Sequence, residues 1–138
     1  KYGFNVHEDY DSDLPVMQGY PDELNQVWTN IIHNAMQAMP DGGDLFISVK
    51  REGDQVVTRI RDTGSGIPDD VLPRIFEAFY TTKAAGEGSG LGLDIVKKIV
   101  EKHQGTIDVE TEINVGTTFI ISIPVDRKPE AANTEAEA

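Results

Sequence analysis

Four short segments of this chain carry residue types that could bind and position a phosphorylated ligand. In chain order they are Asn30–Ala35, Asp62–Pro68, Phe76–Lys83 and Gly86–Leu93. They supply two asparagine amides, an aspartate, a lysine and two glycine-rich stretches. Any one segment alone is weak evidence, because glycine-rich strings also occur in ordinary loops. All four in this order and spacing indicate one composite binding site.

Asn30 and Asn34 lie four residues apart in a predicted helix, so both side chains project from the same face. The amide oxygen of Asn34 is a neutral, hard ligand of the kind that Mg²⁺ accepts. Two solvated surface amides would show the same spacing, and the spacing alone favours that simpler interpretation. Ala35 and Ala38 permit close packing nearby, and together with the later segments they favour the functional interpretation.

Asp62 ends a predicted strand and is followed by Gly64 and Gly66. A carboxylate at the mouth of a pocket accepts a hydrogen bond from an exocyclic amine such as that of adenine, and it repels the carbonyl oxygen of guanine. A buried acceptor left unpaired costs about 1–3 kcal/mol, so this single contact could select the base. The glycines would let the backbone approach a flat ring without an intervening Cβ atom. An ordinary Asp-Gly turn after a strand is the alternative.

Gly88, Gly90 and Gly92 precede a predicted helix, which places free backbone N–H groups and the positive end of a helix dipole at one point. Such a point attracts anions. The spacing is not that of a Walker loop, because Lys83 precedes the glycines, and no strand leads directly into them as in a dinucleotide fingerprint. Lys83 could reach a terminal phosphate, or it could be a solubilising loop lysine.

Hydrophobic periodicity predicts the elements that must position these residues. Apolar residues at helical spacing predict helices over Asp22–Met39 and about Leu91–Gln104, the second ended by Gly105. Alternating residues predict strands over Phe4–Glu8, Leu45–Lys50, Val56–Asp62, Thr106–Thr111 and Thr117–Ile123. Pro68–Glu77 could hold a short helix, and Ala84–Gly90 reads as a mobile loop. The expected fold is an α+β two-layer sandwich, with helices on one face of a sheet of about five strands.

Length and charge limit the classes of function. The chain of 138 residues is expected to form one domain over residues 1–125, followed by a flexible acidic tail over residues 126–138. A net charge of −12 argues against nucleic acids and anionic membranes as partners. The same charge repels a polyphosphate, so local donors, a helix N-terminus and a divalent cation would have to outweigh that repulsion.

The location of the protein is suggested by what the sequence lacks. It contains no cysteine, so disulfides and thiolate metal sites are excluded, which fits a reducing cytoplasm. No apolar run approaches the roughly 20 residues of a membrane span, and there is no signal-peptide pattern. The chain begins at Lys1 without a methionine, which suggests a fragment of a longer protein that could itself be anchored in a membrane.

Taken together, the four segments resemble the N, G1, F and G2 boxes of the catalytic and ATP-binding domain of bacterial sensor histidine kinases. Gly116-Thr117-Thr118-Phe119 resembles the last glycine-threonine motif of that domain. This family shares the Bergerat fold with gyrase, Hsp90 and MutL, and the resemblance implies a mixed sheet under three helices. It implies nucleotide contacts by Asn30, Asn34, Asp62, Gly64, Gly66, Ile67, Thr82, Lys83, Gly88, Ser89, Gly90, Leu91, Gly92 and Thr117. Catalytic parts would fall to Asn30 and Lys83, and Mg²⁺ to Asn34.

The resemblance also implies the reaction and its partners. ATP and Mg²⁺ would be the cofactors, and the γ-phosphoryl group would pass to a histidine on a helical dimerisation domain of the same protein, and from there to a response regulator. The family's phosphoacceptor segment is absent, since His7-Glu8-Asp9-Tyr10 does not match it. Gln37 stands where many members carry a basic residue, which leaves more of the phosphate binding to Lys83. The isolated domain is expected to be monomeric, without nucleic-acid or direct membrane contacts.

Two rival interpretations stay open. One is a serine kinase of the anti-sigma type, against which the Thr82-Lys83 ending and the acidic start of the chain argue. The other is a catalytically silent ATP-binding module that only engages partners, against which the intact Asn34, Asp62 and glycines argue.

Overall fold

The computed structural model describes residues 3–15, 19–77 and 92–125. Its elements in chain order are β1 (Phe4–Tyr10), α1 (Pro21–Gln37), β2 (Gly43–Glu52), β3 (Gln55–Asp62), the 3₁₀-helix η1 (Leu72–Arg74), α2 (Gly92–Lys102), β4 (Thr106–Glu112) and β5 (Gly116–Pro124). Every predicted strand and both predicted long helices are present. The largest difference among the strands is at β2, which extends two residues beyond the predicted Leu45–Lys50 at both ends. β1 continues to Tyr10 rather than ending at Glu8.

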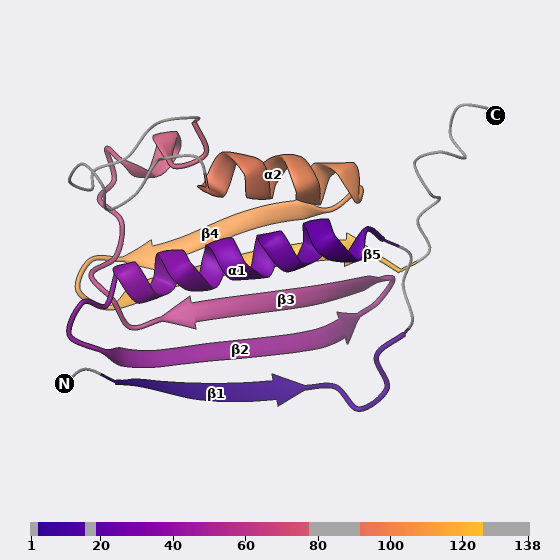
Figure 1. The fold of residues 1–138 in the computed structure, drawn as a ribbon, viewed down its shortest axis with the longest axis horizontal. Helices are drawn as coiled ribbons and strands as arrows, with labels where there is room; N and C mark the ends of the chain where they lie inside the picture. The colour runs from indigo at the N-terminus through magenta and orange to yellow at the C-terminus, as the bar shows by residue number, and fades with distance from the viewer. Residues whose placement is uncertain (1–2, 16–18, 78–91, 126–138) are drawn as a thin grey trace.

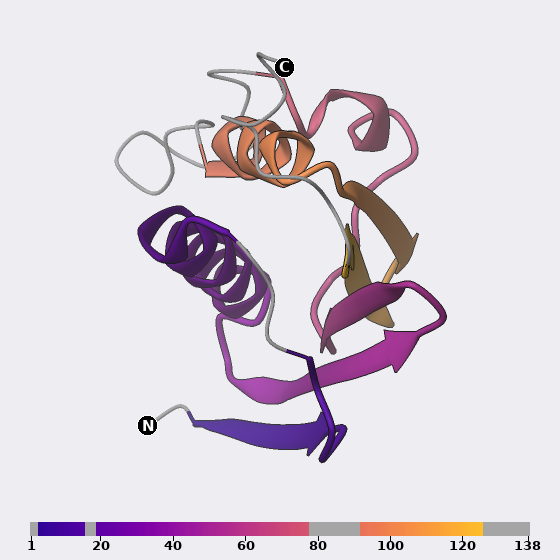
Figure 2. The same ribbon diagram turned by 90° about the vertical axis from the view of Figure 1, so that its right-hand side faces the viewer.

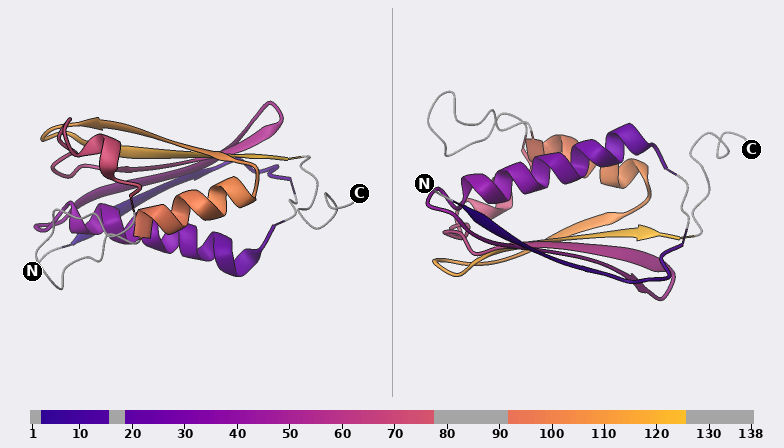
Figure 3. Two further views of the ribbon diagram at one scale, coloured as in Figure 1. Left: turned by 90° about the horizontal axis from the view of Figure 1, so that it is seen from above. Right: turned by 60° about the horizontal axis from the view of Figure 1, so that its bottom comes forward.

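The five strands form one mixed sheet in the order β1-β2-β3-β5-β4 (Figure 1). β1 runs parallel to β2, and each of the other neighbouring pairs is antiparallel. Both α-helices lie on the same face of this sheet (Figures 2 and 3). The predicted two-layer α+β architecture is therefore confirmed.

The family resemblance implied three helices, and the described residues contain two α-helices and one short 3₁₀-helix. The 3₁₀-helix lies within Pro68–Glu77, where a short helix was expected. Pro73 explains its length, because proline has no N–H group to donate and restricts the residue before it. Tight turns replace the α-helix, with Val71 N–H donating to Pro68 O at 3.0 Å and Arg74 N–H to Val71 O at 2.8 Å.

The core lies between the helices and the sheet, and it follows from the two periodicities. In α1 the residues at four-residue spacing, Val27, Ile31 and Ala35, are all buried. They pack with apolar residues of α2 and of the inward face of the sheet: Leu45, Ile60, Val96, Ile99, Val100, Phe119, Ile121 and Ile123. None of the helices in the described residues is long and apolar enough for a membrane crossing.

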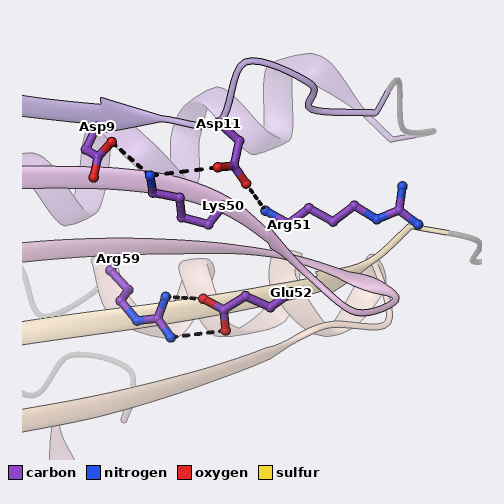
Figure 4. Close-up of polar contacts among 6 residues, drawn as sticks. All are labelled: Asp9, Asp11, Lys50, Arg51, Glu52 and Arg59. Carbon is purple, nitrogen blue, oxygen red and sulfur yellow. Dashed lines mark hydrogen bonds and ion pairs between the residues drawn. The ribbon is translucent and has the colours of Figure 1, made fainter.

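The edge strand β1 is held to the sheet partly by charges, because most of its side chains are exposed. Lys50 Nζ on β2 lies 2.8 Å from Asp9 Oδ1 and 3.8 Å from Asp11 Oδ1 (Figure 4). Arg51 N–H donates to Asp11 Oδ2 at 2.7 Å, just past the end of β1. Exposed pairs of this kind each contribute little, roughly 0–1 kcal/mol, so they supplement the parallel backbone ladder.

The C-terminal end of α2 differs from the prediction in one residue. Gly105 was expected to end the helix, which ends at Lys102, and the left-handed residue after it is Gln104, with φ 62°. Gly105 N–H then donates to Val100 O at 2.9 Å, the six-to-one bond of a Schellman motif. Gly105 is needed for another reason, since a Cβ atom there would lie 2.4 Å from Ser122 O on β5. The chain passes too close to the sheet for any side chain.

His103 joins the end of α2 to the start of α1. Although it is a polar residue near the end of a helix, it is 0% exposed. Its Nε2 accepts the Tyr20 N–H at 3.0 Å, so Nδ1 carries the hydrogen and donates to Ile99 O at 2.8 Å. Tyr20 is the N-cap residue of α1 and makes no side-chain cap hydrogen bond. The imidazole therefore fixes where α1 begins.

We expect His103→Ala to lower the free energy of unfolding by about 2–4 kcal/mol, because it leaves the Tyr20 N–H without its acceptor and opens a cavity. Urea denaturation followed by circular dichroism measures this directly. His33→Ala is the matched control, since His33 is exposed on α1. Its free energy of unfolding should match that of the wild type within about 0.5 kcal/mol. Equal stabilities of the two variants would contradict the role assigned to His103.

Candidate nucleotide site

Segments far apart in the sequence meet at one end of the fold, on the left of Figure 1. The C-terminal end of α1, the end of β3, the start of α2 and the turn between β4 and β5 all lie there. Hydrogen bonds confirm these contacts, because Ser65 N–H donates to Ala38 O at 3.2 Å and Asn114 N–H donates to Ser65 O at 2.8 Å. The loop after Asp62 therefore lies between α1 and the β4–β5 hairpin.

Asp62 is the central side chain of this end. It is 2% exposed, and its Oδ1 accepts two backbone hydrogen bonds, from Gly64 N–H at 2.8 Å and from Thr117 N–H at 3.2 Å. Burial raises the pKa of the carboxyl, and the two backbone donors act in the opposite direction. Within the described residues every hydrogen bond of this carboxylate uses Oδ1. Oδ2 is thus available as an acceptor for a ligand.

The role predicted for Gly64 and Gly66 was to let the backbone approach a flat ring. The structure gives a different steric reason for both. A Cβ atom at Gly64 would lie 2.5 Å from Ala38 O of α1. Gly66 has φ +80°, and a Cβ atom there would lie 2.4 Å from Glu112 O. These glycines let the loop fit between α1 and the hairpin, and so bring Asp62 to its position.

Ile67 and Thr117 were both predicted site residues, and a third residue joins them. Ile67 N–H donates to Thr111 Oγ1 at 2.9 Å, and Thr111 Oγ1 lies 2.9 Å from Thr117 Oγ1. Sequence reasoning missed Thr111. A signal was present, because the predicted hairpin over Thr106–Thr111 and Thr117–Ile123 places Thr111 opposite Thr117, and the structure has that register.

Asn30 and Asn34 lie on the side of α1 that faces α2. Asn30 Nδ2 donates to Gly92 O at 3.1 Å and so joins α1 to the first residue of α2. Asn34 is half-buried, and its side chain makes no hydrogen bond within the described residues. Its amide oxygen is therefore free to bind Mg²⁺, and the residues fit that role. The described residues contain no cluster of three or more His, Asp and Glu side chains, so a metal here would need oxygen ligands from the nucleotide and water.

The remaining predicted residues fall outside the described part of the chain. These are Thr82, Lys83, Gly88, Ser89, Gly90 and Leu91, together with the loop predicted over Ala84–Gly90 and the tail over residues 126–138. Of the three glycines Gly88, Gly90 and Gly92, only Gly92 is described, and it is the first residue of α2.

Asp94 is a buried carboxylate next to the candidate site, and sequence reasoning did not single it out. It lies in the first turn of α2 and is 7% exposed. Its Oδ2 is 3.6 Å from Lys98 Nζ, while its Oδ1 is buried without a hydrogen-bond partner among the described residues. A carboxylate in this position is stabilised by the positive end of the helix dipole. It also reduces the attraction of that helix end for a phosphate, so a phosphate site here needs further cationic groups.

An apolar cavity lined by described residues lies elsewhere. It has a volume of about 480 Å³ and lies beside the opposite flank of α1, against β1, β2 and β3. Its lining residues are Glu8, Tyr10, Leu24, Trp28, Ile32, Ile47, Val49, Val56, Thr58, Ile60 and Ile123. The buried stripe of α1 separates this flank from Asn30 and Asn34, so the cavity is not part of the candidate site.

Comparisons with known proteins agree with this geometry. Residues 19–127 match the family described as histidine kinase-, DNA gyrase B- and HSP90-like ATPase. The chain is 44% identical over 119 residues to sporulation kinase E of Bacillus subtilis (strain 168), covering 86% of this chain and 16% of that kinase. It is 42% identical over 113 residues to sensor histidine kinase ZraS of Escherichia coli (strain K12), covering 82% of this chain and 24% of that kinase. The chain thus spans about a sixth to a quarter of the length of these relatives.

Solved structures show the same likeness. The nucleotide-free catalytic domain of histidine kinase ThkA aligns with a TM-score of 0.78 at 31% identity, over 88% of this chain and 79% of that one. Full-length ShkA in complex with AMPPNP aligns with a TM-score of 0.78 at 28% identity, over 91% of this chain and 26% of that one. On these grounds, the chain belongs to the histidine kinase-, DNA gyrase B- and HSP90-like ATPase family, and it is similar to the catalytic domains of histidine kinases.

Proposed function

We propose that this chain binds Mg·ATP and donates the γ-phosphoryl group to a histidine on a helical dimerisation and phosphoacceptor domain of the same protein, for onward transfer to a response regulator. The observation that carries the proposal is Asp62. This carboxylate is buried at a convergence of three segments, and two backbone N–H groups hold its Oδ1 while Oδ2 is left for a ligand.

Asp62 would recognise the adenine base. With Oδ1 occupied by Gly64 and Thr117, the carboxylate cannot rotate freely, so Oδ2 presents an acceptor in a fixed direction. The N6 amine of adenine can donate to it, whereas the O6 carbonyl of guanine would meet it as a second acceptor. A site built to accept one hydrogen bond discriminates strongly against a ligand that cannot donate it.

Asn34 would bind Mg²⁺ through its amide oxygen, and the ion would supply positive charge for the phosphates. Asn30 holds the first residue of α2 beside α1 through its bond to Gly92 O, so its catalytic part would be to position that helix end. Lys83 would bind the γ-phosphate, with the glycines Gly88, Gly90 and Gly92, and with Thr82, Ser89 and Leu91, as further nucleotide contacts. Catalysis would consist mainly of positioning and charge neutralisation.

We place the phosphoryl acceptor outside this chain. All three histidines of the sequence are described, and none fits the role. His103 is fully buried with both ring nitrogens hydrogen-bonded. His7 Nε2 is paired with Asp44 at 3.2 Å, and its ring stacks on Phe46. His33 is exposed but lies on α1, whose neighbours Ile31 and Ala35 hold the helix in the core.

We expect wild-type protein to bind Mg·ATP more tightly than Mg·GTP, and Asp62→Asn to weaken ATP binding at least tenfold, about 1.4 kcal/mol. The asparagine oxygen can still accept the Gly64 and Thr117 N–H groups, so its NH₂ replaces Oδ2 and meets the adenine amine as a second donor. The same NH₂ can donate to guanine, so the preference for ATP should fall by more than the loss of ATP affinity alone. Isothermal titration calorimetry with both nucleotides measures these values.

Asp108→Asn is the matched control for that experiment, because Asp108 is an exposed carboxylate on β4. It should leave both nucleotide affinities unchanged. Equal affinity of the wild-type protein for ATP and GTP would contradict the assignment of Asp62.

We expect no radiolabel on this chain after incubation with γ-labelled ATP, since reacting atoms must approach to about 3–3.5 Å in line and none of its histidines is placed for that. Mixed with the helical phosphoacceptor domain of the same protein, the chain should transfer acid-labile label to that domain. Lys83→Ala should slow the transfer, and Lys50→Ala, whose side chain on β2 pairs with Asp9, should not.

Separate counting of the two polypeptides after electrophoresis distinguishes the alternatives. Stoichiometric label on this chain alone would overturn the two-part reaction. Acid-stable label on a serine would favour a kinase of the anti-sigma type, and nucleotide binding without any label on the partner would favour a silent binding module.

A further inference from the structure

We propose that Thr111 is a positioning residue of the nucleotide site, whose hydroxyl holds the loop after Asp62 and the Asp62 carboxylate in the arrangement that selects adenine. The inference rests on the proposed function for its ligand, and on the ligand-free structure for its geometry. Thr111 lies on β4, outside the four segments that identify the site in the sequence.

The Thr111 hydroxyl contacts three separate parts of the site. It accepts the Ile67 N–H at 2.9 Å, which fixes the far end of the loop that Asp62 begins. It lies 2.9 Å from the hydroxyl of Thr117 and 3.3 Å from Gly116 O, both at the start of β5. Among the described residues it is the only side-chain hydroxyl that bonds to a backbone N–H between Ser65 and Pro68.

One assignment of hydrogen-bond donors and acceptors satisfies all three contacts of the Thr111 hydroxyl. A hydroxyl has one hydrogen to donate and two lone pairs that accept. If the Thr111 hydroxyl donates to Gly116 O, it can accept both the Ile67 N–H and the Thr117 O–H. Every polar group in the set is then satisfied. Removing the Thr111 oxygen leaves an N–H and an O–H without their acceptor at the same time.

Two routes connect this hydroxyl to the Asp62 carboxylate. The first is the loop, because Gly64 N–H binds Asp62 Oδ1 and Ile67 closes the same loop on Thr111. The second is Thr117, whose hydroxyl contacts Thr111 and whose N–H also binds Asp62 Oδ1. Both donors to Asp62 therefore belong to residues or segments that Thr111 holds. A change at Thr111 should alter base recognition although Thr111 itself need not contact the nucleotide.

The middle of the loop, at Ser65, is held by backbone groups that a substitution at Thr111 does not remove. Ser65 N–H binds Ala38 O at 3.2 Å, and Asn114 N–H binds Ser65 O at 2.8 Å. A Thr111 variant should therefore keep the loop near its place while releasing its far end. We expect a change in affinity and base preference rather than loss of the fold.

The decisive experiment replaces Thr111 by valine, which keeps the shape and the β-branching but removes the hydroxyl. Calorimetry should show ATP binding weakened about tenfold, with a smaller effect on GTP, so the ATP:GTP preference falls. Thr111→Ser, which restores the hydroxyl, should recover most of the affinity. Thr106→Val is the matched control, since Thr106 is an exposed threonine on the same strand whose hydroxyl makes no hydrogen bond within the described residues, and it should bind like the wild type.

Amide exchange on the ligand-free protein provides a second readout. The Ile67 amide should exchange faster in Thr111→Val than in the wild type or in Thr106→Val, and Thr111→Ser should be slow again. Thr111→Ala replaces the valine variant in both measurements if the latter does not fold.

The outcomes separate this proposal from the proposed function. If wild-type protein does not bind ATP, the proposed function fails, and the exchange of the Ile67 amide still tests whether Thr111 holds the loop. If wild-type protein binds ATP and Thr111→Val binds ATP and GTP with unchanged affinities, the role of Thr111 is overturned. An equal loss in Thr111→Val and Thr111→Ser would also overturn it, because the hydroxyl would then not be the cause.

Discussion

The buried carboxylate of Asp62 is the constraint on which the rest of the site depends. An ionised group 2% exposed to solvent is unfavourable unless hydrogen bonds replace its lost hydration. Here one donor is the N–H group of Gly64, in the loop after β3, and the other is the N–H group of Thr117, near the start of β5. The fold must therefore bring the end of β3, the following loop and the start of β5 together. Thr117 lies opposite Asp62 in the β3–β5 register, so the antiparallel ladder itself delivers one donor.

Much of the fold and part of the site could be predicted from the sequence, because both depend on periodic patterns. Val27, Ile31 and Ala35 repeat at helical spacing and are buried as expected. Asp62 stands where a strand ends, and its burial and hydrogen bonds agree with a binding role. Asn30 and Asn34 project toward α2 because their spacing in a helix requires a common face.

The rest depended on contacts between distant segments, which no local pattern reports. His103 appears polar and terminal in sequence, yet Tyr20 N–H and Ile99 O satisfy its ring, and burial follows. Gly64 was assigned to ligand approach, whereas the limiting neighbour is Ala38 O of α1. Thr111 is an ordinary strand residue until the register places it opposite Thr117. The short helix expected within Pro68–Glu77 is present, as the 3₁₀-helix Leu72–Arg74.

The charge distribution explains why base recognition and phosphate binding would be separate tasks in such a site. A chain of net charge −12, with the buried carboxylate of Asp94 in the first turn of α2, repels polyphosphate unless compensating charge lies close to it. Base recognition by Asp62 requires no positive charge, because a neutral amine donates to a carboxylate. Under the function proposed above, adenine would bind beside α1, β3 and β5, while phosphate binding would depend on Mg²⁺ and Lys83. With this division, a loss of Thr111 or Asp62 would change which base is bound, and a loss of Asn34 or Lys83 would change whether the phosphoryl group is transferred.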